Sequence, residues 1–105
     1  MASVKTMFRA STVSAKQGVI YFQIIQNRVV RQLTTDYRIF SNEWDGESIQ
    51  TAGSDSERRN YLKTTIERIE WDLKLLRSIV NQFERRQQRY TADDIIATFK
   101  QSANA

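Results

Sequence analysis

A long apolar repeat in residues 57–88 constrains the fold of this chain more than any other feature. Large apolar side chains recur there at alternating spacings of four and three, which is the period of one helix face, and neither Gly nor Pro interrupts the stretch. The repeat consists of Leu62, Ile66, Ile69, Leu73, Leu76, Val80 and Phe83. A helix of this length would measure about 48 Å, whereas a seven-residue strand spans about 23 Å. We therefore expect a small sheet to cover about half of the helix, and a second partner, inside or outside the molecule, to cover the rest.

The ends and sides of this helix can also be predicted. Ser54 and Glu57 have the spacing of a capping box, which marks the expected start. Trp71 lies opposite the apolar repeat. A second apolar group, which indicates a second packing surface, lies between them and consists of Tyr61, Leu75 and Ile79.

The segment after residue 90 predicts a short helix that could match this second surface. Thr91 has the position of an N-cap, and Asp93 and Asp94 follow in the first turn, where the helix dipole favours carboxylates. The apolar residues of the segment are Ile95, Ile96 and Phe99. We expect this helix to pack over Trp71, with a binding role for Trp71 as the alternative.

Residues 3–40 have the composition of strands. Alternating and β-branched patterns over 4–9, 19–26 and 29–35 predict three strands. A loop that ends at Gly18 separates the first two, and Asn27 and Arg28 form a hairpin turn between the last two. The sequence thus predicts an α+β fold: a three-stranded antiparallel sheet packed on one long helix, with a short C-terminal helix.

Charge divides the chain into distinct units. Residues 1–40 carry six basic side chains and one acidic, whereas residues 41–56 carry four acidic side chains and no basic ones. The net charge of +4 and the pI near 9.7 favour a polyanionic partner. We divide the chain into a domain over 1–90, with the sheet at 3–40, a connector at 41–56 and the long helix at 57–88, and a segment 91–105 that begins a linker or a further domain.

Composition excludes most catalytic chemistry. The sequence contains no His and no Cys, and therefore neither the commonest general base nor a thiol nucleophile. We expect no enzymatic activity, cofactor or metal site in this chain. The absence of thiols fits a cytoplasmic location, and no apolar stretch approaches the roughly 20 residues of a membrane span.

The face of the sheet opposite the core is the predicted DNA-binding surface. Its basic side chains could neutralise phosphates, and its Gln, Thr and Arg side chains could reach base edges in the major groove. By strict alternation Arg31 falls on the apolar face; either a bulge turns it outward or it lies at the sheet margin. The candidates are Lys5, Arg9, Tyr21, Gln23, Gln32 and Thr34 on the face, with Lys16, Arg28 and Arg31 at turns and edges. The alternative is an ordinary solvated sheet face.

Five segments resemble the N-terminal arm-type DNA-binding domain of phage-integrase-like tyrosine recombinases from bacterial mobile elements. They are Gly18–Gln23 (GVIYFQ), Arg28–Thr35 (RVVRQLTT), Tyr37–Phe40 (YRIF), Glu43–Asp45 (EWD) and Tyr90–Ile95 (YTADDI). The last of these looks like the lead-in to the core-binding domain of that family. In order, the segments extend over nearly the whole chain, although the hairpin turn of the family often contains Gly and this one does not.

The resemblance implies a function in DNA integration and recombination. Family members insert a three-stranded sheet, backed by a helix, into the major groove of arm-type sites in double-stranded DNA. The histidine-containing motifs and tyrosine nucleophile of the catalytic domain have no match here, so we expect an N-terminal module of a longer integrase. The alternative function is a protein-interaction module that dimerises or docks through its long helix.

Overall fold

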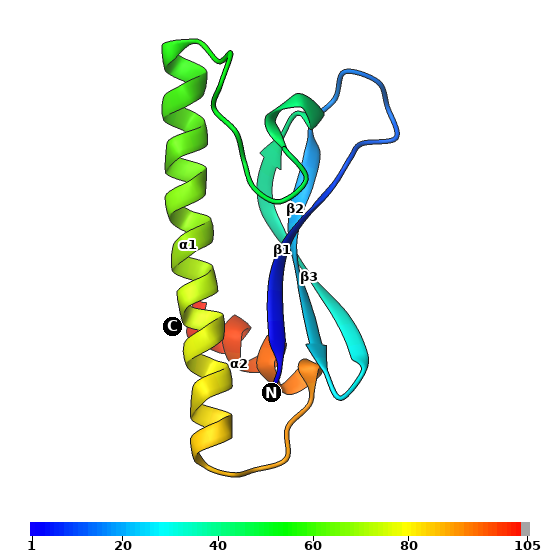
Figure 1. Cartoon of the computed structure of the whole chain (residues 1–105), viewed down its shortest axis with the longest axis vertical. Coiled ribbons are helices and arrows are strands. Elements are labelled where there is room, and N and C mark those ends of the chain that lie inside the picture. Colours follow the sequence, from blue (N-terminus) through cyan, green and yellow to red (C-terminus); the bar gives the residue numbers. More distant parts are fainter. Residues whose placement is uncertain (104–105) are drawn as a thin grey trace.

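A computed structural model describes residues 1–103 and shows an α+β fold, a three-stranded antiparallel sheet with two helices (Figure 1). This confirms the predicted fold class. The elements are β1 (Ser3–Arg9), β2 (Gly18–Gln26), β3 (Val29–Ile39), a 3-10 turn (Ser41–Glu43), α1 (Ser56–Arg85) and α2 (Ala92–Ala103). The last two residues of the predicted segment 91–105 lie outside the described residues.

The sheet is a meander of two hairpins in the order β1-β2-β3. The turn between β2 and β3 places Asn27 at φ 51° and Arg28 at φ 67°, the left-handed pair that a two-residue hairpin turn requires. At the other end of β2, Gly18 lies against β1, because a Cβ atom there would be 2.2 Å from the carbonyl oxygen of Arg9. This close approach to β1 explains why residue 18 is a glycine, and no left-handed φ value is needed to explain it.

The register between β2 and β3 shifts between Val19 and Tyr21. Thr35 completes the hydrogen bonding at this irregularity, since its hydroxyl donates to the carbonyl oxygen of Ile20 at 2.6 Å and accepts from the amide of Tyr37 at 3.1 Å. Pairing then resumes with Val19 opposite Arg38. As a result β3 continues to Ile39, four residues beyond the predicted end of the strand.

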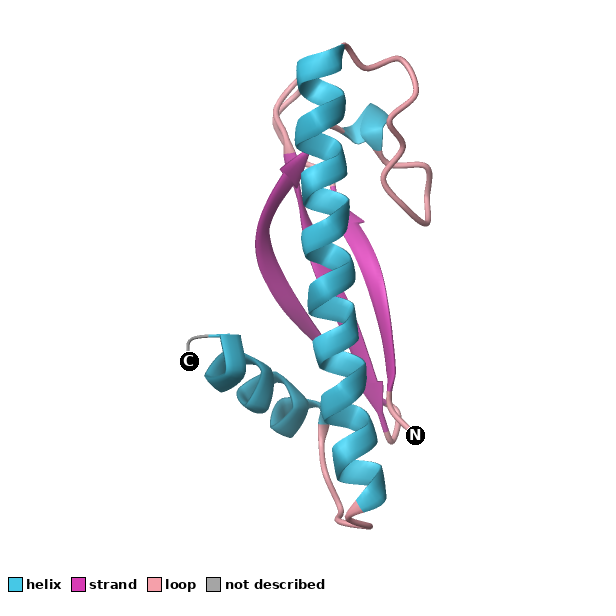
Figure 2. Cartoon of the chain, turned by 90° about the vertical axis from the view of Figure 1, so that its left-hand side faces the viewer, coloured by secondary structure: helices cyan, strands magenta, loops and turns pink. Residues whose placement is uncertain are grey.

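One face of the sheet packs on α1, which runs along it in Figure 2. Even-numbered residues of β2 and alternate residues of its neighbours point into this core, as their spacing predicted. Burial of apolar side chains here is the main source of stability. The buried apolar residues are Ile20, Phe22, Ile24, Leu33, Ile39, Leu62, Ile69, Leu76, Ile79, Val80, Tyr90, Ala92 and Ile95. Much of the apolar repeat is therefore used inside the molecule.

The ends of α1 differ from the prediction by a few residues. Asp55, and not Ser54, is the N-cap, because its carboxylate accepts a hydrogen bond from the amide of Arg58 at 2.8 Å. The helix ends at Arg85, before the predicted Gln88, and Gln87 takes a left-handed φ of 53°. The chain thus changes direction after α1 without the glycine that often follows the end of a helix.

The second helix, α2, contacts α1, β2 and β3. Thr91 caps it as predicted: its hydroxyl accepts from the amide of Asp94 at 3.1 Å, and the Asp94 carboxylate accepts from the amide of Thr91 at 2.9 Å. With twelve residues, α2 is longer than the short helix expected there. The prediction that it covers Trp71 is wrong, because Trp71 is 71% exposed. Instead α2 buries Ala92 and Ile95 in the common core.

Neither helix in residues 1–103 combines the length and the apolar character that a membrane crossing requires.

Candidate nucleic-acid interface

The face of the sheet turned away from α1 brings together residues of all three strands, and we call it the outer sheet face. The register places the six predicted face residues on it together. Side chains that alternate with the buried ones point to this side. The face consists of Ser3, Lys5, Met7 and Arg9 from β1, Val19, Tyr21, Gln23 and Ile25 from β2, and Val30, Gln32, Thr34 and Arg38 from β3.

Arg9 is the last residue of the edge strand β1, and its side chain links the three strands of this face. Its guanidinium carbon lies 4.8 Å from the centroid of the Tyr21 ring, within the range of a cation–π interaction. The same guanidinium donates a hydrogen bond to the side-chain oxygen of Gln32 on β3. The fork of Arg9 is therefore held across the sheet, with further donors available to a ligand.

A row of three polar side chains crosses the sheet beside this cluster. Lys5 pairs with Gln23, and Gln23 pairs with Gln32, so the three lie side by side on neighbouring strands. Gln side chains can make two hydrogen bonds with the major-groove edge of adenine. The lysine ammonium can bind a phosphate as a point charge. The row thus combines a group suited to the backbone of DNA with groups suited to its bases.

Arg38 is a basic residue of this face that the strand pattern did not predict. The predicted strand ended at Thr35, whose hydroxyl forms its hydrogen bond at the register shift beyond which β3 continues. The sequence contains a weak indication that the strand continues, because Arg38 and Ile39 extend the alternation of polar and apolar residues. Since Arg38 pairs with Val19, it extends the basic surface toward the end of the sheet near the connector.

The remaining predicted residues lie at three different places. Lys16 belongs to the loop between β1 and β2, and Arg28 to the turn between β2 and β3, so both are at the ends of the outer sheet face. Arg31 lies opposite Ile24, and its side chain is on the core side at the sheet margin. There its Nε donates to the Asp93 carboxylate of α2 at 3.2 Å. The bulge considered for Arg31 lies elsewhere, between Val19 and Tyr21.

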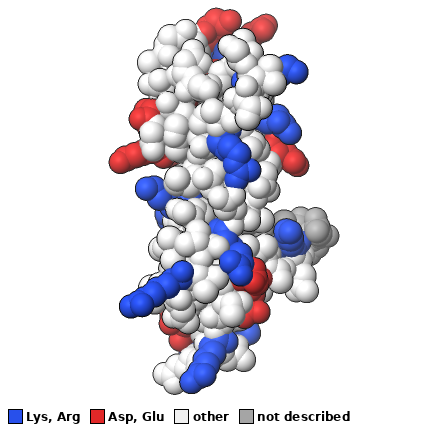
Figure 3. All heavy atoms as spheres, turned by 90° about the vertical axis from the view of Figure 1, so that its right-hand side faces the viewer, with Lys and Arg blue, Asp and Glu red and all other residues white. Residues whose placement is uncertain are grey.

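The charge of the outer sheet face is mainly positive. Figure 3 shows this side of the molecule, with Lys and Arg side chains spread along its length and the acidic side chains mostly toward its edges. Among the strands of residues 1–103, Asp36 is the one acidic residue, whereas Lys5, Arg9 and Arg38 lie on this face and Arg31 lies on the core side. This arrangement provides a positive potential that attracts a polyanion.

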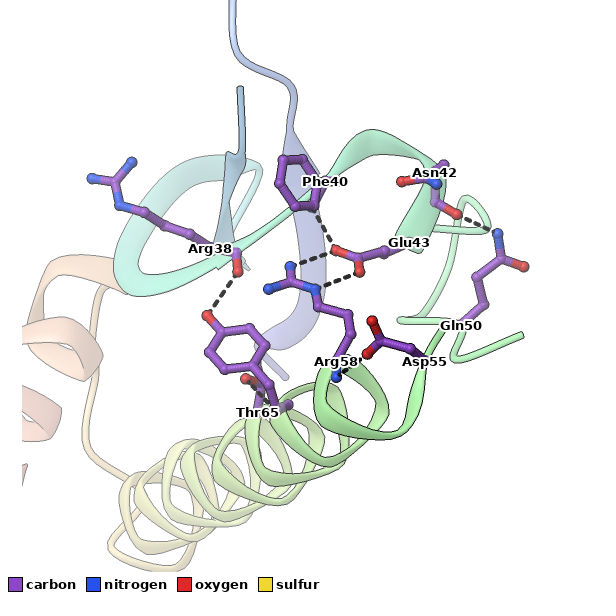
Figure 4. Close-up of polar contacts among 9 residues, drawn as sticks. Arg38, Phe40, Asn42, Glu43, Gln50, Asp55, Arg58 and Thr65 are labelled. Atoms are coloured by element: carbon purple, nitrogen blue, oxygen red, sulfur yellow. Dashed lines mark hydrogen bonds and ion pairs between the residues drawn. The ribbon is translucent and has the colours of Figure 1, made fainter. Parts of the chain in front are cut away.

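A partly buried ion pair fixes the connector near the Arg38 end of the sheet (Figure 4). The Arg58 guanidinium donates from Nε and from a terminal nitrogen to the two oxygens of Glu43, both at 2.7 Å. Its carbon also lies 4.5 Å from the ring centroid of Tyr61, whose hydroxyl donates to the carbonyl oxygen of Arg38 at 2.9 Å. The hydrogen bonds from Arg58 lower the pKa of Glu43, a shift that burial opposes and the Phe40 amide assists. The pair therefore stays charged and holds β3, the connector and α1 together.

The arrangement of the acidic residues gives little indication of a metal site. Within residues 1–103, they form no group of three or more that could hold a metal ion. Asp45 instead accepts hydrogen bonds from the amides of Glu47 and Ser48 at 2.8 Å, and these lower its pKa. This carboxylate stabilises the connector loop.

No protein-family model, curated protein sequence or solved structure matches this chain.

Proposed function

We propose that the chain binds double-stranded DNA by inserting the outer sheet face into the major groove. The observation that carries the proposal is the cluster of Arg9, Tyr21 and Gln32 across a face that both helices leave uncovered. A sheet whose only task is to cover a core does not need a guanidinium held across three strands. Such a group is well suited to a phosphate or to the O6 and N7 atoms of guanine.

The dimensions of the sheet fit this mode of binding. Three strands at the usual spacing are about 10 Å wide, and the major groove of B-DNA is about 12 Å wide. The opposite face of the sheet is not accessible to DNA, because α1 and α2 pack against it. The outer sheet face is the side that supports docking.

The side chains divide by their chemistry into two groups. Lys5, Arg9, Lys16, Arg28 and Arg38 suit phosphates, because they are cationic and lie on the edge strands or in the loops between strands. Gln23, Gln32 and Thr34 are uncharged hydrogen-bonding side chains of β2 and β3, and they suit base edges. Arg31 is assigned to the contact with Asp93 and not to DNA.

We further propose that this DNA-binding unit acts in the cytoplasm as the N-terminal module of a site-specific tyrosine recombinase. The support is the resemblance to arm-type domains, whose sheet-and-helix architecture agrees with the α+β fold described above. In this proposal the chain itself recognises arm-type sites, and a separate catalytic domain breaks and rejoins DNA strands. The boundary at residue 90 remains a prediction.

Selection from a random duplex library, followed by fluorescence anisotropy, tests DNA binding even when the target site is unknown. With about four or five phosphate contacts, the logarithm of affinity should fall against the logarithm of salt with a slope near −4. Arg9→Ala should weaken binding to all duplexes, and Gln23→Ala should relax discrimination at one base position. Lys63→Ala, on α1 away from this face, is the matched control and should leave binding unchanged.

Two results would overturn the proposal. One is the absence of any duplex retained by the selection at low salt. The other is an equal loss of affinity in Arg9→Ala and Lys63→Ala, which would show that the charge of the molecule, and not the outer sheet face, attracts DNA.

A further inference from the structure

Trp71 is a large apolar side chain on the side of α1 that faces away from the sheet. It is 71% exposed, and its ring has the Lys74 ammonium 5.5 Å from its centroid. Figure 2 views the molecule from the α1 side, where the helix lies in front of the sheet along most of its length. An exposed tryptophan has a large apolar area to bury and is enriched at interfaces.

The charges around Trp71 are ordered along the helix. Glu67 and Glu70 precede it, and Lys74 and Arg77 follow it; all four are exposed. Two shallow hollows show that they share one flank of α1. The first, of about 270 Å³, is lined by Glu67, Glu70, Trp71 and Lys74. The second, of about 440 Å³, shares Glu70 and Lys74 and includes Arg77 and the partly buried Leu73.

This order of charges is complementary to itself. If two copies of the flank meet antiparallel about a two-fold axis near residue 72, Glu70 of each copy faces Lys74 of the other. Glu67 then faces Arg77, and the two Trp71 side chains meet near the axis. Parallel pairing would instead place each Glu70 beside the other, which is unfavourable. A two-fold interface requires this kind of self-complementary patch.

We propose that a second copy of this chain docks on this flank, with the two α1 helices antiparallel and the two Trp71 side chains in contact near the axis, each beside Glu70 and Lys74 on its own helix. The charge order selects the antiparallel orientation, and burial of the two indoles supplies the apolar contact. This interface is distinct from the apolar repeat of α1, which packs inside the molecule. It also leaves the outer sheet face free, so the proposal does not depend on DNA binding.

Sedimentation velocity at low ionic strength tests this dimer. The interface is small, so we expect weak association and examine concentrations up to about 1 mM. Trp71→Ala should raise the dissociation constant at least tenfold, as expected for a central aromatic residue. Glu70→Lys and Lys74→Glu each turn two attractive contacts into repulsive ones and should each raise it about tenfold.

Exchanging the charges at positions 70 and 74 distinguishes a contact between two molecules from an effect within one helix. A mixture of Glu70→Lys and Lys74→Glu chains restores both attractive contacts across the interface, and so does the double variant Glu70→Lys/Lys74→Glu. Both should recover association to within about threefold of the unmodified chain. A pair within one helix cannot produce recovery on mixing.

The control is Glu57→Lys, an equal charge change on the same helix about 21 Å away along its axis. It should leave association unchanged, and far-UV circular dichroism should show every variant folded. A purely monomeric unmodified chain at 1 mM would overturn the proposal. So would a dimer that Trp71→Ala does not weaken, or one that mixing of the two charge variants does not restore.

Discussion

Replacement of Glu43 by Gln should destabilise the whole domain, although Glu43 lies in a connector. Its side chain is 8% exposed and accepts three hydrogen bonds, two from Arg58 and one from the amide of Phe40. Glutamine has nearly the same shape and retains one acceptor oxygen, so it can keep the bond from Phe40. It replaces the other oxygen by an NH₂ group, which cannot accept from Arg58.

The size of the effect follows from the contacts that are lost. A hydrogen bond to a charged group contributes about 1.5–3 kcal/mol, and Arg58 would lose the charge of its buried partner. Because the Arg58 side chain is 24% exposed, water can partly replace that partner. We therefore expect the free energy of unfolding to fall by about 2–3 kcal/mol, which corresponds to a melting temperature lower by about 10–15 °C in a domain of this size.

The pH dependence gives a second test. The pKa of Glu43 is below its ordinary value of 4.5 in the folded chain, because Arg58 donates to the ionised form. A lowered folded-state pKa stabilises the fold at pH values above the unfolded pKa, and the contribution disappears as the pH falls through the folded pKa. The difference between the two chains should be complete near pH 7 and should shrink as the pH falls below about 4.5.

Urea denaturation followed by circular dichroism measures this difference, with equal slopes showing that both chains unfold in the same way. Glu47→Gln is the matched control, because Glu47 is an exposed glutamate of the same connector and should change stability by less than about 0.5 kcal/mol. If Glu43→Gln and Glu47→Gln are equally stable at pH 7, the ion pair does not hold the connector as the structure indicates.

Three further predictions follow from the backbone and the core. Gly18→Ala should lower the free energy of unfolding in urea by about 2 kcal/mol or more, because the new Cβ would lie 2.2 Å from the Arg9 carbonyl oxygen. Arg28→Gly should raise it by up to about 1 kcal/mol, because the left-handed φ of 67° no longer costs steric energy; the same variant should bind DNA more weakly. Tyr37→Phe should remove a phenol that ionises above pH 10 in an ultraviolet titration, since burial and the 2.6 Å hydrogen bond to Asp72 raise the pKa of Tyr37 above its ordinary 10.0.

Strand alternation predicted the sheet well because it depends only on neighbouring residues. The period of two assigned Lys5, Arg9 and Gln23 to one face, and the hairpin at Asn27 and Arg28 fixed which residues pair across β2 and β3. The candidate site was therefore largely predictable in position. Its DNA-binding role depends on a ligand and remains a proposal.

Features that depend on tertiary contacts were not predictable in the same way. Arg38 pairs with Val19 because the register shifts where the Thr35 hydroxyl donates to the Ile20 carbonyl oxygen, and strand alternation alone does not indicate such a shift. Trp71 was expected under α2, but a helical wheel shows only which residues share a side and not which side the next helix covers. The contact of Arg31 with Asp93 joins residues 62 positions apart, and neither residue alone indicates the other.

The strand order β1-β2-β3 has a consequence for folding kinetics. Each strand pairs with its neighbour in the chain, so the sheet can form by closing two short loops, a local step that is entropically inexpensive. The sequence contains no proline, which removes the slow cis–trans isomerisation that delays many refolding reactions. We therefore expect refolding in a single fast phase. The docking of α1 should set the rate of this phase. The connector that precedes α1 is held by the ion pair between Glu43 and Arg58.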